Sequence, residues 1–263
     1  MQYTSKRDSI ELVHLDIMIT PKCTLKCRYC SNLMQHYPED NQTHCETVDI
    51  IAGIDTLMGA VSHIGEAFII GGEPFTHPGL AEGIRAINKN RHKIGYLCVA
   101  SNGLCGVDGP VIAALRETGT PVRITMYKQF VKEQTKRCAI LTAQGVEAGM
   151  YHRVWTLTTQ CVDGTPETFF RHCHHMVMPC VTLRGSKLYY CEFTANADAL
   201  GLSCEHMDMR ESFTKAGLYD FLNPQEPFAA CRYCSGGSSD ICVEAAAEQL
   251  NDPLPVPWIG GAQ

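Results

Sequence analysis

Three cysteines near the start of the chain, Cys23, Cys27 and Cys30, lie within eight residues in the pattern C-x3-C-x2-C. Thiolates are soft ligands, and three of them in so short a loop can hold three irons of a four-iron, four-sulfur cluster. The fourth iron then has no protein ligand and is open to a bound molecule. A zinc knuckle or three unrelated thiols are the alternatives, although zinc sites usually have four protein ligands.

Two further polar motifs each follow an apolar run that is typical of a buried strand. Gly71-Gly72-Glu73-Pro74 comes directly after residues 66–70. Its glycines would let the backbone approach a ligand closely, and the carboxylate could receive a cation. Ser101-Asn102-Gly103 comes after residues 94–100. Ordinary turns are the alternative at both places, and an Asn-Gly turn explains the second motif equally well.

The cysteine pattern, with Tyr29 before its last cysteine, resembles the signature of the radical S-adenosylmethionine (SAM) superfamily. In that family the open iron chelates the amino and carboxylate groups of SAM. An electron from the reduced cluster cleaves the sulfonium to a 5′-deoxyadenosyl radical, which abstracts hydrogen from a substrate. The resemblance implies that Cys23, Cys27 and Cys30 ligate this cluster.

The same resemblance assigns the residues around SAM. The glycine-rich motif is similar to the family's GGEP sequence, which binds the SAM amino group, and Ser101 retains the hydroxyl of a threonine that the family has near the ribose. The cofactor-binding residues implied by the resemblance are Tyr29, Gly71, Gly72, Glu73, Ser101 and Asn102.

The spacing of apolar runs and turns predicts the fold. Strands and helices alternate at intervals of roughly 25 to 30 residues, which is typical of a parallel α/β sheet. Five or six such units are too few for a closed eight-stranded barrel, so we expect a partial (β/α)6 TIM-like barrel with its chemistry at the carboxyl ends of the strands. The expected strands are 14–20, 66–70, 94–100, 122–126, 146–151 and 153–157, and the expected helices are 43–57, 80–90, 111–117 and 134–144.

A change of composition near residue 160 predicts a second region. We expect a barrel at residues 1–160 and a small, cysteine-rich α+β domain at residues 161–263, which holds eight of the fifteen cysteines from Cys161 to Cys242. Within it, residues 183–190 resemble a β-hairpin that turns at 185–186.

This second region resembles the twitch domain, a shortened SPASM domain that holds one auxiliary four-iron cluster. Cys191, Cys231 and Cys234 are its clear ligands. We favour Cys173 as the fourth, because its distance from Cys191 is similar to that in an aminocyclitol dehydrogenase of the superfamily, but Cys180 brackets the hairpin more tightly. A four-cysteine cluster would carry electrons or support the fold, and a zinc ribbon is the alternative.

Two residues are candidates for catalysis. Arg153 would point toward the barrel mouth, where it could hold a substrate group or assist deprotonation of a ketyl radical. Tyr127, after the fourth expected strand, is the second candidate. A structural salt bridge is the alternative for Arg153. His172, His174 and His175 crowd around Cys173, and we expect packing or hydrogen bonds to the ligands rather than ligation.

Composition limits the partners and the compartment. A net charge of −6 argues against nucleic acid and anionic membranes, and no apolar run approaches the length of a membrane span or signal peptide. Fifteen cysteines in metal-like spacings, without a secretion signal, predict a reduced, cytoplasmic, oxygen-sensitive protein.

These inferences predict a radical SAM oxidoreductase with two [4Fe–4S] clusters and SAM. We expect dehydrogenation or epimerisation of a sugar, aminocyclitol or sugar nucleotide, with electrons from a flavodoxin or ferredoxin. The rival enzyme is a maturase that forms a thioether or carbon–carbon crosslink in a ribosomal peptide. A non-catalytic iron–sulfur or zinc protein is the third reading, and it leaves the GGEP motif unexplained.

Overall fold

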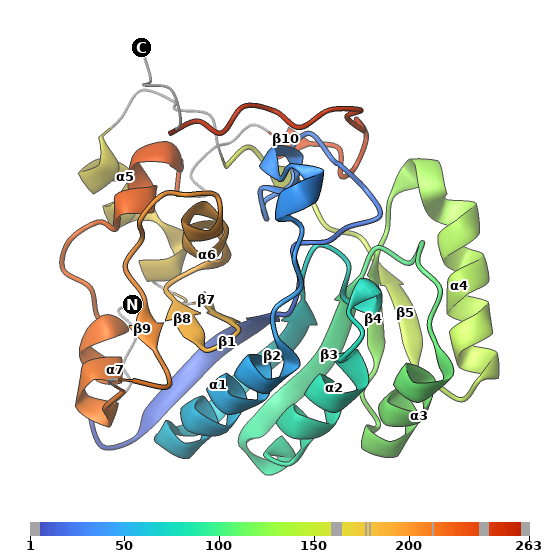
Figure 1. Cartoon of the computed structure of the whole chain (residues 1–263), viewed down its shortest axis with the longest axis horizontal. Coiled ribbons are helices and arrows are strands. Elements are labelled where there is room, and N and C mark those ends of the chain that lie inside the picture. Colours follow the sequence, from blue (N-terminus) through green and yellow to red (C-terminus); the bar gives the residue numbers. More distant parts are fainter. Residues whose placement is uncertain are drawn as a thin grey trace.

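A twisted sheet forms the centre of the computed structural model, which describes residues 6–158, 165–176, 178, 180–211, 213–236 and 242–258. Within these residues the sheet has the strand order β5-β4-β3-β2-β1-β7-β8-β9 (Figure 1). The first six of these strands are parallel to their neighbours, and β8 and β9 are antiparallel. The strands are β1 Ile10–Met18, β2 Val61–Ile70, β3 Ile94–Ser101, β4 Val122–Thr125, β5 Ala148–Tyr151, β7 Cys180–Arg184, β8 Lys187–Tyr189 and β9 Met207–Asp208.

Helices between the parallel strands cover one face of the sheet (Figure 1). They are α1 Thr47–Ala60, α2 Leu80–Asn88, α3 Gly109–Thr118 and α4 Val131–Ala143, and the later helices are α5 Pro166–His172, α6 Glu192–Ala199 and α7 Lys215–Phe221. The main core lies between this helical layer and the sheet, where Leu15 and Ile17 of β1 pack with Ile54 and Leu57 of α1 in one buried cluster. The architecture is α/β, an open partial barrel of the TIM-like kind.

The prediction of a barrel strand at residues 153–157 is wrong. Only β6, Trp155–Thr156, forms there, and it pairs antiparallel with β10, Cys242–Val243, outside the main sheet. The cause is local packing: the Trp155 ring contacts the ring of Tyr127 rather than extending the sheet beyond β5. The sixth parallel strand is instead β7, which adds to β1 at the opposite edge.

The predicted hairpin is confirmed. Arg184 pairs with Lys187 across a two-residue turn, and Gly185 has a φ of +57°, which favours glycine. Because β7 continues the barrel sheet, the regions expected at 1–160 and 161–263 share one sheet, and the boundary between them lies outside the described residues. The first helix begins at Thr47 rather than at the expected Thr43, since Glu46 is its N-cap.

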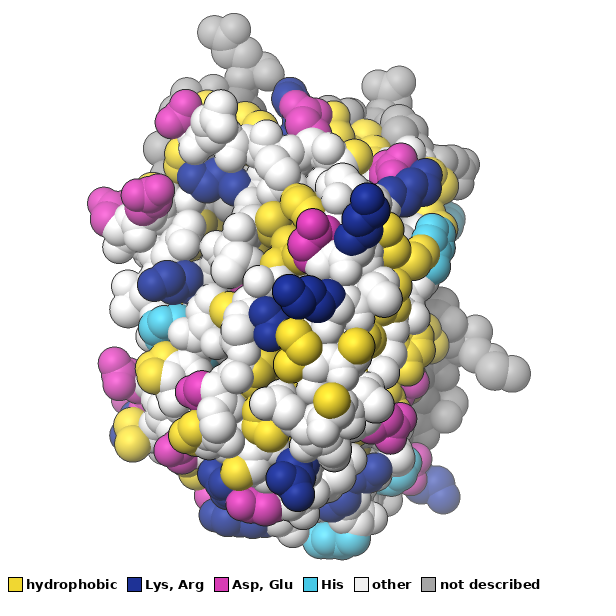
Figure 2. Space-filling model, turned by 90° about the vertical axis from the view of Figure 1, so that its right-hand side faces the viewer, with side chains coloured by type: hydrophobic (Ala, Val, Ile, Leu, Met, Phe, Trp, Pro, Cys, Tyr) yellow, Lys and Arg dark blue, Asp and Glu magenta, His cyan; other side chains and the backbone are white. Residues whose placement is uncertain are grey.

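On the face at the right of Figure 1, the described residues form no continuous band of one charge. Figure 2 shows that face, where basic and acidic side chains are interspersed with apolar ones. Among the described residues, no helix is long and apolar enough to cross a membrane.

Candidate active site

A cavity of about 600 Å³ lies against the inner face of the barrel strands. It is lined by both groups of cysteines that the sequence singled out, together with polar residues of β1, β2 and β4. The predicted site residues that line it are Cys23, Cys27, Tyr29, Cys30, Gly71, Gly72, Ser101, Asn102, Tyr127, Arg153, Cys173, Cys191, Cys231 and Cys234. Glu73 is the predicted site residue that does not line it.

The cysteine loop follows β1 and contacts the glycine-rich motif through the backbone. Gly72 donates from its amide to the carbonyl oxygen of Thr20 at 2.7 Å, and Glu73 donates to that of Lys22 at 2.8 Å. A Cβ atom on Gly72 would lie 2.5 Å from the Lys22 oxygen. Glycine is therefore required at this position because two backbone segments meet there.

Cys27 is buried, Cys23 and Cys30 are partly buried, and the three cysteines are close enough to affect one another. Burial raises the pKa of Cys23, and the neighbouring thiols of Cys27 and Cys30 raise it further. Burial also raises the pKa of Cys27 to about 12 and raises that of Cys30. Three thiols in this position stay protonated unless a cation stabilises the thiolates, so the donor set fits a metal cluster.

Glu73 is fully buried, and its carboxylate is used within the protein. One oxygen accepts from the Ser101 hydroxyl at 2.9 Å and from the amide of Phe75 at 3.2 Å, and the other accepts from the amide of Asn102 at 2.8 Å. Burial raises the pKa of Glu73 to about 7, against these hydrogen bonds. The carboxylate thus fixes the end of β3. Its role toward the amino group of SAM stays a prediction.

Asn102 connects the end of β3 to the cysteine loop. Its side-chain amide donates to the Thr24 hydroxyl at 2.9 Å and to the Cys23 sulfur at 3.8 Å. Gln134 of α4, which is completely buried, donates to the carbonyl oxygens of Asn102 and Thr125 at 2.8 and 2.7 Å. Sequence reasoning missed Gln134, because a glutamine in an amphipathic helix carries no signal that it is buried.

Comparison with known proteins agrees with this arrangement. Residues 17–141, which contain the cysteine loop, the glycine-rich motif and most of α4, match the radical SAM superfamily. This part of the chain is a radical SAM domain. Such a domain implies one [4Fe–4S] cluster and SAM, and it supports an enzyme.

Curated relatives are similar over part of the chain. GTP 3′,8-cyclase of Clostridium perfringens is 29% identical over 123 residues, which are 47% of this chain and 36% of that protein. The chain therefore spans about a third of the curated relative that it matches.

Solved structures are similar over more of the chain. The structure of BtrN with AdoMet and 2-DOIA has a TM-score of 0.52 at 10% identity, over 92% of this chain and all of that one. SuiB of Streptococcus suis bound to S-adenosylmethionine has a TM-score of 0.46 at 13% identity, over 80% of this chain and 66% of that one. The likeness to BtrN shows a shared fold.

The second cysteine group lies beside the radical SAM domain around the start of α6. Burial raises the pKa of Cys234 to about 12 and that of Cys231 to about 11, and Cys173 raises both further. Burial raises the pKa of Cys191 as well, with Cys234 among the causes. These four thiols therefore lie near one another and form a second donor set that fits a metal centre.

Cys180 has different surroundings from the other four. It pairs with His14 in the sheet, and after burial its pKa is raised most by the charges of Asp16 and Glu192 rather than by other cysteines. Cys173 is the cysteine whose charge affects both Cys231 and Cys234 among the described residues, and its role as the fourth ligand stays a prediction.

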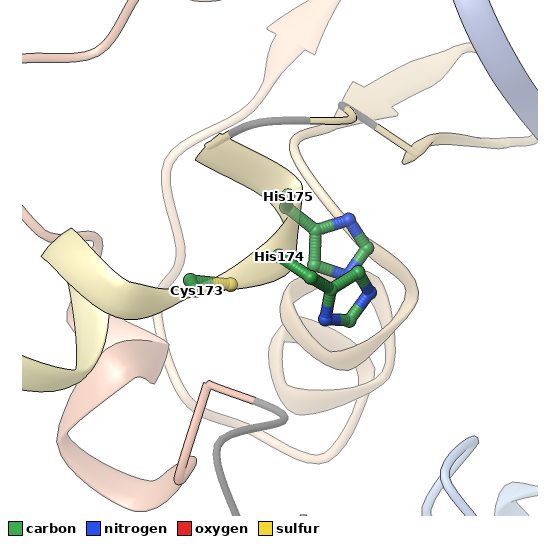
Figure 3. Close-up of side chains that lie close together, drawn as sticks. All are labelled: Cys173, His174 and His175. Atoms are coloured by element: carbon green, nitrogen blue, oxygen red, sulfur yellow. The ribbon is translucent and has the colours of Figure 1, made fainter. Parts of the chain in front are cut away.

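Two histidines follow Cys173 directly. Figure 3 shows their rings lying side by side, with 4.0 Å between the ring centroids. The potential ligand atoms of Cys173, His174 and His175 lie within 4.8 Å of one another. His175 is buried, burial lowers its pKa to about 4, and its Nδ1 is 3.3 Å from the amide nitrogen of Cys180.

Tyr127 and Arg153 occupy different parts of the cavity wall. Tyr127 is buried beside the cysteine loop, and burial, then the thiols of Cys27 and Cys30, raise its pKa well above the usual value. It can therefore donate a hydrogen bond but cannot act as a base near neutral pH. Arg153 lies near Cys30 and Asp16, and its positive charge lowers the pKa of both groups.

Three charged residues on the inner face of the sheet were missed by the sequence analysis. His14 and Asp16 of β1 have 2.9 Å between Nε2 and Oδ1, and the other ring nitrogen of His14 is 3.4 Å from a carboxylate oxygen of Glu66. All three line the cavity. The alternation of His14 and Asp16 with Leu15 and Ile17 along β1 was the available signal, because it places polar side chains on one face of the strand.

Proposed function

We propose that this protein is a radical SAM oxidoreductase that holds two [4Fe–4S] clusters and oxidises a small polar molecule. One observation supports this function above the others. A single cavity of about 600 Å³ is lined by both cysteine groups and by charged side chains. A substrate in that cavity would lie within reach of a radical formed on one side and of an electron acceptor on the other.

The residues of the first group would hold the cluster that activates SAM. Cys23, Cys27 and Cys30 are the proposed ligands, and bound SAM would supply a 5′-deoxyadenosyl radical. The backbone of Gly71 and Gly72, which approaches the cysteine loop closely, would hold the methionine end of SAM. The side chains of Tyr29, Ser101 and Asn102 line the same wall, and Glu73 would support the last two by its hydrogen bonds.

The second group would hold an auxiliary cluster through Cys173, Cys191, Cys231 and Cys234. Four protein ligands leave no open iron, so we assign this cluster to electron transfer rather than to substrate binding. In a dehydrogenation the substrate would lose one hydrogen atom to the SAM-derived radical and then one proton and one electron. The auxiliary cluster is the proposed acceptor of that electron, and a flavodoxin or ferredoxin is the proposed donor of the electron that starts the reaction.

The cavity wall supports a polar substrate. Asp16, Glu66 and Arg153 place carboxylates and a guanidinium around it, and these groups bind hydroxyls and amines well. Sugars, aminocyclitols and sugar nucleotides carry such groups, and BtrN, which shares the fold, was solved with 2-DOIA. Arg153 would hold a substrate hydroxyl and assist the loss of its proton, and Tyr127 would donate a hydrogen bond near the cysteine loop.

The test is the iron and sulfide content after anaerobic reconstitution. Wild type is compared with a Cys23/Cys27/Cys30→Ala variant and with Cys138→Ala, which changes a partly buried cysteine of α4 packed against the main core. We expect about eight irons in wild type and in the control, and about four in the triple variant. With dithionite and SAM, only wild type and the control should form 5′-deoxyadenosine.

Two results would contradict the proposal in different ways. About four irons in wild type would remove the auxiliary cluster and the electron acceptor with it. Zinc in place of iron, together with no cleavage of SAM, would remove the enzymatic function altogether.

A further inference from the structure

The C-terminal segment, residues 242–258, crosses the cysteine loop, and we name it the C-terminal strap. Arg28 donates from its amide to the carbonyl oxygen of Glu248 at 3.0 Å, and Leu250 donates to that of Lys26 at 2.9 Å. An ion pair between Arg28 and Glu248, with 2.6 Å between nitrogen and oxygen, lies at the edge of this contact. The strap therefore pairs with the stretch that carries the middle cysteine of the loop.

Gln249 is the strap residue that reaches the sulfur. Its Nε2 is 3.1 Å from the Cys27 sulfur and 2.9 Å from the Ala246 carbonyl oxygen, while its Oε1 accepts from the amide of Lys26 at 3.0 Å. The backbone partners fix which end of the amide is which, because Oε1 must face the Lys26 N–H and Nε2 must face the Ala246 oxygen. The N–H group is thus aimed at the sulfur by contacts that do not involve the sulfur.

We propose that Gln249 is a positioning residue that donates an N–H···S hydrogen bond to Cys27 and raises the reduction potential of the cluster that this cysteine would hold. This inference depends on the proposed function, which assigns the cluster to Cys23, Cys27 and Cys30. Reduction by one electron adds negative charge that is shared with the ligand sulfurs. A hydrogen-bond donor aimed at one sulfur stabilises the reduced form more than the oxidised form.

The burial of the sulfur strengthens this effect. Cys27 is 5% exposed, so water competes little for the sulfur and the local dielectric constant is low.

The strap is held at several other points, so replacement of Gln249 should not release it. Leu254 donates from its amide to the carbonyl oxygen of Gln35 at 2.7 Å, and the Trp258 ring donates to that of Leu200 at 3.1 Å. Gln129 also contacts the carbonyl oxygen of Ala246. These contacts allow the sulfur hydrogen bond to be tested apart from the docking of the strap.

The experiment measures the midpoint potential of the SAM cluster in the full reconstituted protein by an EPR-monitored redox titration. Its signal is identified as the one that the Cys23/Cys27/Cys30→Ala variant lacks. Gln249→Leu removes the donor while filling the space, and Gln249→Glu replaces the donor with a negative charge at the same size. Glu248→Gln is the matched control, since it weakens the ion pair with Arg28 but leaves the Gln249 amide in place.

We expect lower potentials in both Gln249 variants and a wild-type potential in Glu248→Gln. At the wild-type midpoint, the ratio of reduced to oxidised cluster in Gln249→Leu should fall about tenfold, which is about 59 mV for one electron. Unchanged potentials in both Gln249 variants, with the cluster present, would overturn the inference. Equal shifts in Gln249→Leu and Glu248→Gln would also overturn it, because docking of the strap would then be the cause. If wild type lacks the EPR signal assigned to Cys23, Cys27 and Cys30, the proposed function itself fails instead.

Discussion

The carboxylate of Glu73 accepts a hydrogen bond from the hydroxyl of Ser101, with 2.9 Å between the two oxygens. This contact joins the end of β2 to the end of β3 underneath the cavity wall. The same carboxylate also receives the amide of Asn102, whose side chain in turn reaches the cysteine loop. Glu73 is therefore connected to the cysteine loop through Asn102.

Glu73 should make stability depend on pH. Its pKa in the folded protein is about 7, above the ordinary 4.5, because of burial. The folded state therefore binds more protons than the unfolded state between these values, so stability falls as pH rises from 4.5 to 7. We expect this fall to amount to about 3 kcal/mol, since one pKa unit corresponds to about 1.4 kcal/mol.

Glu73→Gln removes the titrating group and so isolates the contribution of Glu73 to the pH dependence of stability. The free energy of unfolding of the apoprotein, measured by urea denaturation at pH 5 and pH 7.5, should fall more in wild type than in the variant. The same fall in both proteins would mean that other groups cause it.

Gly72→Ala should destabilise the protein by about 1–3 kcal/mol, the usual cost of overpacking. The added methyl group would meet the backbone oxygens of Lys22 and Pro21 at 2.5 and 2.7 Å, and backbone cannot rotate away as a side chain can. Gly83→Ala in α2 is the control, because no atom beyond its chain neighbours and the backbone of its own helix lies within 4 Å of its Cβ position. The control should gain about 0.5–1 kcal/mol from the preference of helices for alanine. Urea midpoints measure both, and equal midpoints would contradict the close approach.

The sequence could predict the groups that are contiguous along the chain. The cysteine loop, the glycine-rich motif and the Ser101-Asn102 turn each combine reactive residue types within a few positions, and each follows a strand that ends at the cavity. The alternation of strands and helices in a parallel sheet follows from the same periodicity. These motifs could therefore be placed around one cavity with a single further rule, that the carboxyl ends of parallel strands lie at the same edge of the sheet.

The remaining contacts depend on residues that are far apart in sequence. Gln249 is 222 positions from Cys27, and Gln134 is 32 positions from Asn102. An isolated glutamine has no pattern that indicates its partner. The error in the strand expected at residues 153–157 has another cause, because a short apolar run does not show whether it joins the main sheet or pairs elsewhere.

His14 should have a raised pKa that depends on Asp16. Burial lowers the pKa of His14, but hydrogen bonds and charge from Asp16 and then Glu66 outweigh it, so the net shift is upward. Asp16→Asn should therefore lower the pKa of His14, measured by NMR titration of its ring proton with His14→Gln for assignment. Glu66→Gln should lower it less, because the Glu66 side chain is 53% exposed and its charge is screened by water. An unchanged pKa in Asp16→Asn would contradict the contact.

Cys173 and Cys180 should differ in their effect on iron content. Cys173 raises the pKa of Cys231 and Cys234, whereas Cys180 lies in β7 next to His14. Cys173→Ser should therefore lose the auxiliary cluster and fall from about eight irons to about four, while Cys180→Ser should retain about eight. Both variants should still form 5′-deoxyadenosine from SAM and dithionite, since neither changes the first cysteine group. The opposite pattern would assign Cys180 as the ligand, since Cys180 lines the same cavity as the other thiols.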